Sequence, residues 1–166
     1  MKLPLIFWLP AAIALAADLV SKHFIFAFLQ GLPPDAHGRL RHAILEPLLV
    51  LQLERNTGGV FGILRGKGYV FVILTLAALG AVFWMLRKAE PGQRILPLAL
   101  GLVAAGALGN LVDRLWFGHV RDFFYVEIIN WPAFNVADAC ICVAAGLLVL
   151  EVVRAEARER RAKTAS

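Results

Sequence analysis

The sequence predicts an all-α membrane protein with four transmembrane helices, a small extracytoplasmic β-sheet and a surface-lying amphipathic segment. Hydrophobic residues make up 60% of the chain and charged residues 17%, whereas soluble domains are roughly 45–50% apolar and about 25% charged. The apolar residues gather in four segments, each close to the ~20 residues that span a bilayer. We therefore expect residues 1–166 to form a single integral membrane domain.

The apolar segments predict four helices, at about 4–28, 68–87, 94–115 and 132–154. The first could instead be a secretory signal, because Lys2 precedes an apolar run that contains A-x-A at 14–16. The apolar character continues past Val20, so we expect this helix to be retained.

The distribution of basic residues predicts the topology. The short connection 87–94 and the tail 155–166 are rich in Lys and Arg, so both termini should be cytoplasmic. The basic residues of 30–68 then lie outside, where a long segment follows the rule less strictly. The net charge of +5 comes mostly from residues that flank apolar segments, which argues against a nucleic-acid partner.

Two segments outside the helices carry structure of their own. In 30–67, LLVLQLER (48–55) alternates as a half-buried strand does, NTGG follows as a turn, and VFGIL (60–64) is a second strand candidate. RDFFYVEIINW (121–131) is aromatic and amphipathic, so we expect it to lie along the membrane surface.

With this topology, most intramembrane polar residues fall in the outer third of the membrane. Asp18 and Lys22, four residues apart, are consistent with an intrahelical ion pair or with a binding role. Asp113 could cap the third helix or orient Arg114. Amide side chains at 110 and 135 could simply bond neighbouring helices.

Asp122 and Asp138 are harder to explain structurally. Asp138 lies six residues beyond Pro132, about 9 Å into a helix that starts there, and no Lys or Arg lies one turn away. Two carboxylates in one low-dielectric site share a proton, so one can activate water while the other protonates a leaving group. This is aspartic peptidase chemistry, and it needs neither metal nor cofactor. The alternative is a small proton-coupled transporter subunit, in which an intramembrane Asp relays protons.

Five motifs in order resemble the bacterial lipoprotein signal peptidase family, signal peptidase II. They are ADLVSK (17–22), RNTGGVFG (55–62), GALGNLVDR (106–114), HVRDF (119–123) and PAFNVADAC (132–140). The resemblance implies that Asp122 and Asp138 are catalytic. It further implies that a second group of residues shapes the site and holds substrate: Asp18, Lys22, Asn56, Gly58, Asn110, Arg114 and Asn135.

The same resemblance implies the reaction and its setting. Enzymes of this family cut diacylglyceryl-modified prolipoproteins just before the lipidated cysteine, in the bacterial cytoplasmic (inner) membrane, and are inhibited by globomycin. We expect a monomer whose active site lies near the outer face and whose partners are prolipoproteins and membrane lipids. The sequence departs from the family in GGVF, where GAAF is usual, and in a longer segment at 31–47.

Overall fold

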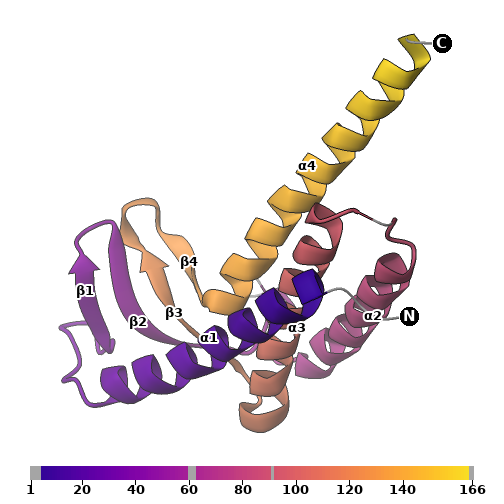
Figure 1. Ribbon diagram of the computed structural model, residues 1–166. Helices are drawn as coiled ribbons and strands as arrows, with labels where there is room; N and C mark the ends of the chain where they lie inside the picture. Colours follow the sequence, from indigo (N-terminus) through magenta and orange to yellow (C-terminus); the bar gives the residue numbers. More distant parts are fainter. Residues whose placement is uncertain (1–4, 60–62, 91, 165–166) are drawn as a thin grey trace.

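The computed structural model describes residues 5–59, 63–90 and 92–164. Over these residues the chain forms four long helices and one small sheet (Figure 1). The helices are α1 (Leu5–Gln30), α2 (Gly68–Arg87), α3 (Ile95–Phe117) and α4 (Val136–Thr164). All four are long and apolar enough to cross a membrane. The predicted membrane helices and sheet are thus confirmed.

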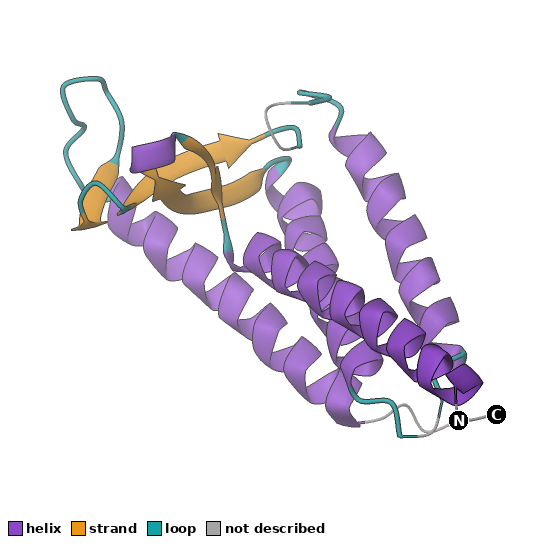
Figure 2. Cartoon of the chain, turned by 90° about the horizontal axis from the view of Figure 1, so that it is seen from above, coloured by secondary structure: helices purple, strands orange, loops and turns teal. Residues whose placement is uncertain are grey.

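The sheet has four antiparallel strands in the order β1-β2-β3-β4. These are β1 (Arg41–Leu45), β2 (Leu49–Asn56), β3 (Val120–Val126) and β4 (Trp131–Phe134), with a 3-10 turn, η2 (Glu127–Ile129), between the last two. The central pairing of β2 with β3 sets Glu54 opposite Asp122. Figure 2 shows the sheet at the C-terminal end of α1. There Phe26 and Leu29 of α1 pack with Leu51 and Phe123 in one apolar cluster.

The largest differences from the predicted elements lie between α1 and α2 and around the start and end of α4. Residues 121–131 join the sheet, which the sequence did not indicate, because β2 offers β3 an edge to pair with; their position along the membrane surface stays a prediction. Of the strand predicted at 60–64, residues 60–62 lie outside the described residues, and the last two residues form a turn. The fourth helix begins at Val136, not at 132, because Trp131–Phe134 pairs with β3. The basic tail stays helical as far as Thr164.

Helix α3 lies at the centre of the bundle. The most apolar stretch of α3 is 56% buried by the rest of the chain, whereas that of α2 is only 11% buried. Helix α2 therefore presents most of its surface to lipid. Close approach depends on glycine. A Cβ on Gly101 would lie 2.6 Å from the Phe7 carbonyl oxygen, and one on Gly106 would lie 2.5 Å from the Ala137 carbonyl oxygen. Small residues therefore let α1 and α4 contact the α3 backbone directly.

Candidate active site

The start of α4 holds Asp138 through a reciprocal pair of hydrogen bonds. The Asp138 backbone N–H donates to Asn135 Oδ1 at 3.0 Å, and the Asn135 backbone N–H donates to Asp138 Oδ2 at 3.2 Å. This is a capping box, with Asn135 as the capping residue. Asp138 therefore lies in the first turn of α4, and the predicted depth of about 9 Å is wrong because the helix starts later. At this position the helix dipole favours a negative charge.

Asp122 reaches the same site from β3. Its carboxylate is only 1% exposed and accepts two amide hydrogen bonds. Asn56 Nδ2 donates to Oδ2 at 3.0 Å, and Asn135 Nδ2 donates to Oδ1 at 2.7 Å. Asn135 thus contacts both carboxylates, which joins the two aspartates that the sequence singled out. Burial, followed by the nearby charge of Asp138, raises the pKa of Asp122 to about 7.

Asn110 of α3 joins the other side of the pair to a buried cation. Its Nδ2 donates to Asp138 Oδ1 at 2.8 Å. Its Oδ1 accepts from Asn135 Nδ2 at 3.1 Å and from Lys22 Nζ at 3.0 Å. The Asn110 Oδ1 atom therefore only accepts and the Nδ2 atom only donates. Because Lys22 can only donate, its bond to Oδ1 fixes the orientation of the Asn110 amide.

The predicted ion pair within α1 is confirmed, and it extends between helices. Lys22 Nζ lies 2.7 Å from Asp18 Oδ2 and 3.4 Å from Asp113 Oδ2. Asp18 Oδ1 accepts from the Ala137 backbone N–H at 2.9 Å, next to the capping box. Asp18 and Lys22 are completely buried, so they support the site from behind.

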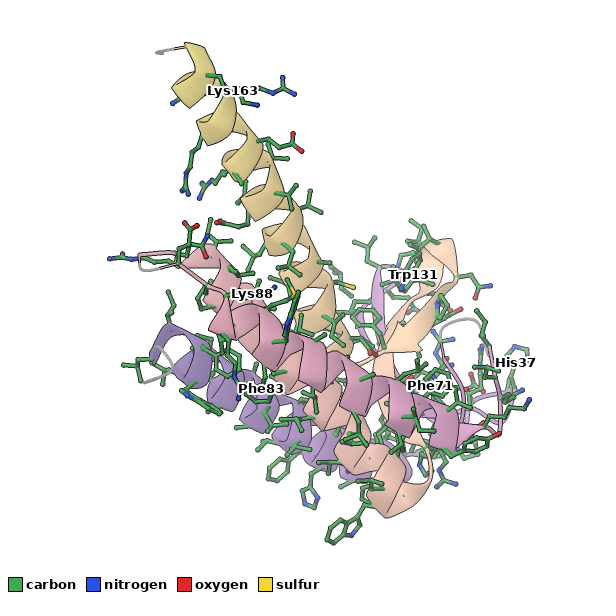
Figure 3. The ribbon with its side chains drawn as sticks, turned by 90° about the vertical axis from the view of Figure 1, so that its right-hand side faces the viewer. His37, Phe71, Phe83, Lys88, Trp131 and Lys163 are labelled. Carbon is green, nitrogen blue, oxygen red and sulfur yellow. The ribbon has the colours of Figure 1, made fainter. Side chains whose placement is uncertain are left out.

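Arg114 connects α3 to the turn that follows β2. Its guanidinium donates to the carbonyl oxygens of Gly58 at 3.2 Å and Asn110 at 3.4 Å, and it lies over the Phe71 ring. Figure 3 shows Phe71 on the helix next to this turn. Gly58 must be small, because a Cβ there would lie 2.8 Å from the Ile63 carbonyl oxygen. The Gly58 N–H in turn donates to Asn56 Oδ1 at 2.9 Å.

Asp113 has partners other than those predicted. The structure assigns it no bond to Arg114; instead its Oδ1 accepts from the Arg121 guanidinium at 2.7 and 3.1 Å, and its Oδ2 from the Arg121 backbone N–H at 2.9 Å. The reason is the end of α3. Gly118 takes a left-handed conformation, φ 74°, and turns the chain back so that β3 starts beside Asp113. Arg121 was missed because no helical spacing links it to Asp113.

The predicted site residues therefore form a continuous network across three helices and the sheet. One carboxylate is buried and easily protonated, while the other is part-exposed and surrounded by N–H donors. Among the described residues, no cluster of three or more His, Cys, Asp or Glu could hold a metal ion. Two carboxylates joined by one asparagine on a bundle of apolar helices fit the paired acids of an aspartic peptidase, and this chain is an aspartic peptidase with several apolar membrane helices.

Comparison with known proteins identifies the family. The sequence profile of Signal peptidase (SPase) II matches residues 10–154, and the chain belongs to that family. The lipoprotein signal peptidase of Halalkalibacterium halodurans is 39% identical over 125 residues, which is 74% of this chain and 80% of that protein. The Bacillus subtilis lipoprotein signal peptidase is 30% identical over 95% of this chain and 99% of its own.

Solved structures agree with the sequence relatives. A bacterial membrane enzyme determined by the in meso method at 2.3 Å superposes with a TM-score of 0.78. It is 29% identical, and the match covers 88% of this chain and 86% of that one. The chain is thus a multi-pass bacterial membrane enzyme with signal peptidase II function. These findings give no support to the transporter alternative.

Proposed function

We propose that this enzyme removes signal peptides from diacylglyceryl-modified prolipoproteins by cutting just before the lipidated cysteine, with Asp122 and Asp138 as the catalytic pair. The observation that carries the proposal is Asn135, whose amide donates to Asp122 while its backbone N–H donates to Asp138. A single residue thus sets the relative position of two carboxylates from different elements.

The surroundings of the carboxylates suggest different roles for the two. Asp138 accepts hydrogen bonds from Asn110 Nδ2 and from a backbone N–H at the start of α4, so N–H donors already contact its carboxylate. Asp122 has a pKa raised to about 7 by burial and by Asp138, so it carries the shared proton near neutral pH. Asp138 is then the general base and Asp122 the general acid.

The proposed reaction uses this division in two steps. Asp138 accepts a proton as water attacks the carbonyl carbon of the residue before the cysteine, and Asp122 gives its proton to the carbonyl oxygen. The tetrahedral intermediate then collapses. The C–N bond breaks as the cysteine nitrogen takes the proton from Asp138, and the hydroxyl proton returns to Asp122. The pair ends in its starting protonation state, and neither a cofactor nor a metal takes part.

The remaining site residues support this pair. Asn56, Asn110 and Asn135 hold the carboxylates through hydrogen bonds, while Asp18 and Lys22 hold Asn110 and the start of α4. Arg114 and Gly58 fix the turn that follows β2. That turn lies beside the pair, so we assign it to the substrate's lipid head region or to the backbone near the scissile bond.

We further propose a single membrane domain in the cytoplasmic membrane, acting as a monomer, with both termini cytoplasmic. The site then lies near the outer face, because Asp138 follows the start of α4 and Asn110 precedes the end of α3. A diacylglyceryl cysteine keeps its acyl chains in the outer leaflet, and its scissile bond is at the same depth. The substrate helix would need little unfolding to reach the pair.

Cleavage of a lipidated precursor peptide tests the assignment. Asp122→Asn and Asp138→Asn should each lose at least ~10²–10⁴-fold in turnover, and the double variant should be little worse because the pair acts as a unit. Activity should persist with a chelator and be blocked by globomycin. The matched control is Asp35→Asn, a carboxylate that also accepts backbone N–H bonds but lies in the loop before β1. An active Asp122→Asn or Asp138→Asn enzyme would refute the proposal.

A further inference from the structure

An apolar patch lies at one end of the sheet, where the β1–β2 and β3–β4 turns meet. Its members are large hydrophobic side chains, each 47–65% exposed: Ile44, Leu45, Leu48, Ile128, Ile129 and Trp131. We call these six residues the hairpin-tip patch. Exposed apolar clusters of this kind mark sites of interaction with proteins or membranes.

The two turns form one rigid surface. The Ile128 backbone N–H donates to the Pro47 carbonyl oxygen at 3.1 Å, which joins the turns directly. The Arg41 side chain, from the start of β1, forms an ion pair at 2.8 Å with Glu127 of η2, which ties β1 to the β3–β4 turn. Backbone and charge contacts therefore hold the patch in place. Its side chains are exposed on ordered turns and do not belong to a loosely packed loop.

We propose that the hairpin-tip patch inserts into the headgroup and upper acyl region of the bilayer. In Figure 1 the sheet lies beside α1 and the tip of β1 points away from that helix, so the patch extends sideways from the bundle. The lipid-facing surface of α1 continues into the sheet. Phe24 and Phe28 are exposed on α1, and the Phe28 ring meets His42 of β1 at 5.2 Å.

The composition of the patch favours lipid over a protein partner. Tryptophan is enriched where membranes meet water, since its ring is apolar and its N–H remains wet. Figure 3 shows Trp131 on the ribbon of the β3–β4 turn. His42 and Arg41 lie on the same strand as Ile44, as expected for groups that remain at headgroup level while their neighbours enter the acyl region.

Insertion would set the depth of the catalytic pair. Asp122 lies on β3, four residues before Val126 at the end of the strand, or about 13 Å along an extended chain. A patch anchored in the interface therefore holds Asp122 at a fixed height relative to the acyl chains. The choice of the outer leaflet rests on the proposed function, but insertion itself does not.

Tryptophan quenching in lipid nanodiscs tests the inference. The reporter is full-length enzyme in which Trp8, Trp84 and Trp116 are changed to Phe, so that Trp131 is the remaining Trp. We expect strong quenching by lipids brominated close to the headgroup, weaker quenching by lipids brominated at the chain end, and little quenching by aqueous iodide. A second reporter, Leu76→Trp on a background without other Trp residues, should respond to deeper bromines, because Leu76 lies in the middle of α2 and is exposed.

A reporter on a loop that stays in water serves as the negative control. His37→Trp on the Trp-free background places the reporter on the loop before β1 and should be quenched by iodide alone. If Trp131 behaves like this control, the patch is in water and the inference is wrong. If Trp131 is shielded from both quenchers and nanodiscs contain cross-linked pairs, the patch contacts a second copy and the inference is also wrong.

A substitution links insertion to activity. Leu48→Asp combined with Ile129→Asp should reduce bromine quenching of Trp131 and lower turnover severalfold in nanodiscs, while turnover in detergent micelles stays close to that of the unmodified enzyme. Equal turnover of the variant in both settings would show that the patch does not position the catalytic pair. Turnover by the unmodified enzyme tests the proposed function separately.

Discussion

Lys22 is a completely buried cation whose removal should destabilise the protein more than almost any other single change in α1. Its Nζ compensates Asp18 at 2.7 Å and contributes to Asp113 at 3.4 Å. Lys22→Met keeps the length and apolar stem of the side chain but leaves Asp18 as an uncompensated buried charge, whereas Asp113 retains Arg121. Breaking a buried pair in this way typically costs about 3–5 kcal/mol.

The double variant Lys22→Met/Asp18→Asn separates charge from volume. An Asn at position 18 can still accept the Ala137 backbone N–H that Asp18 accepts at 2.9 Å. Replacing both members of a buried pair is often close to neutral, so the double variant should lose less stability than Lys22→Met, with about 1–3 kcal/mol left for one unsatisfied amide.

Activity should not follow stability in this series. Both variants lack the Lys22 donor to Asn110 Oδ1, which fixes the amide that bonds Asp138. Turnover should therefore stay low in the double variant even though its stability recovers. The assays are unfolding of the detergent-solubilised enzyme with increasing SDS, followed by intrinsic fluorescence, and peptide cleavage. A Lys22→Met enzyme as stable as the original, or a double variant no more stable than the single one, would refute the reasoning.

Three further outcomes are expected. Asp122, with a pKa of about 7, holds its proton below that pH and loses it above, so turnover should fall as pH rises through 7. Asn56→Ala removes a donor to the ionised form of Asp122 and should move this fall to higher pH. A purely structural role of Asn56 would leave the pH of the fall unchanged. Arg114→Lys keeps the charge but not the two-carbonyl geometry and should lower kcat/KM by about tenfold or more, as loss of one charged hydrogen bond worth about 1.5–3 kcal/mol would; unchanged kinetics would exclude that role. Gly106→Ala meets a carbonyl of α4 and should cost about 1–3 kcal/mol in SDS unfolding, whereas Gly80→Ala, in open space, should not; equal stability of the two would contradict the packing argument.

The two carboxylates could be predicted because an unneutralised charge in an apolar segment needs a reason of its own. The same sequence could not show that Asp138 occupies a helix start. That position depends on Trp131–Phe134 pairing with β3, a contact between strands that no local pattern encodes. Pro132 is a common first residue of a helix, so the local signal favoured the earlier start.

Partnerships between charges were predictable within a helix and not beyond it. Asp18 and Lys22 are one turn apart on α1, and the ion pair follows from that spacing. Asp113 and Arg121 lie on different elements, brought together by the left-handed turn at Gly118. Strand β1, Arg41–Leu45, has no alternation of its own and exists because β2 pairs with it. Contacts that depend on tertiary pairing were therefore the ones that sequence patterns missed.

The order of the strands along the chain has a consequence for biosynthesis. Strand β2 ends at Asn56 and β3 begins at Val120, and the two membrane helices α2 and α3 lie between them in the sequence. The strands can pair only if both helices insert as a hairpin and return the chain to the side it left. A nascent chain that misses either insertion leaves Asn56 and Asp122 on opposite sides of the bilayer. A wrongly inserted copy is then inactive, so catalytic competence itself reports correct membrane integration.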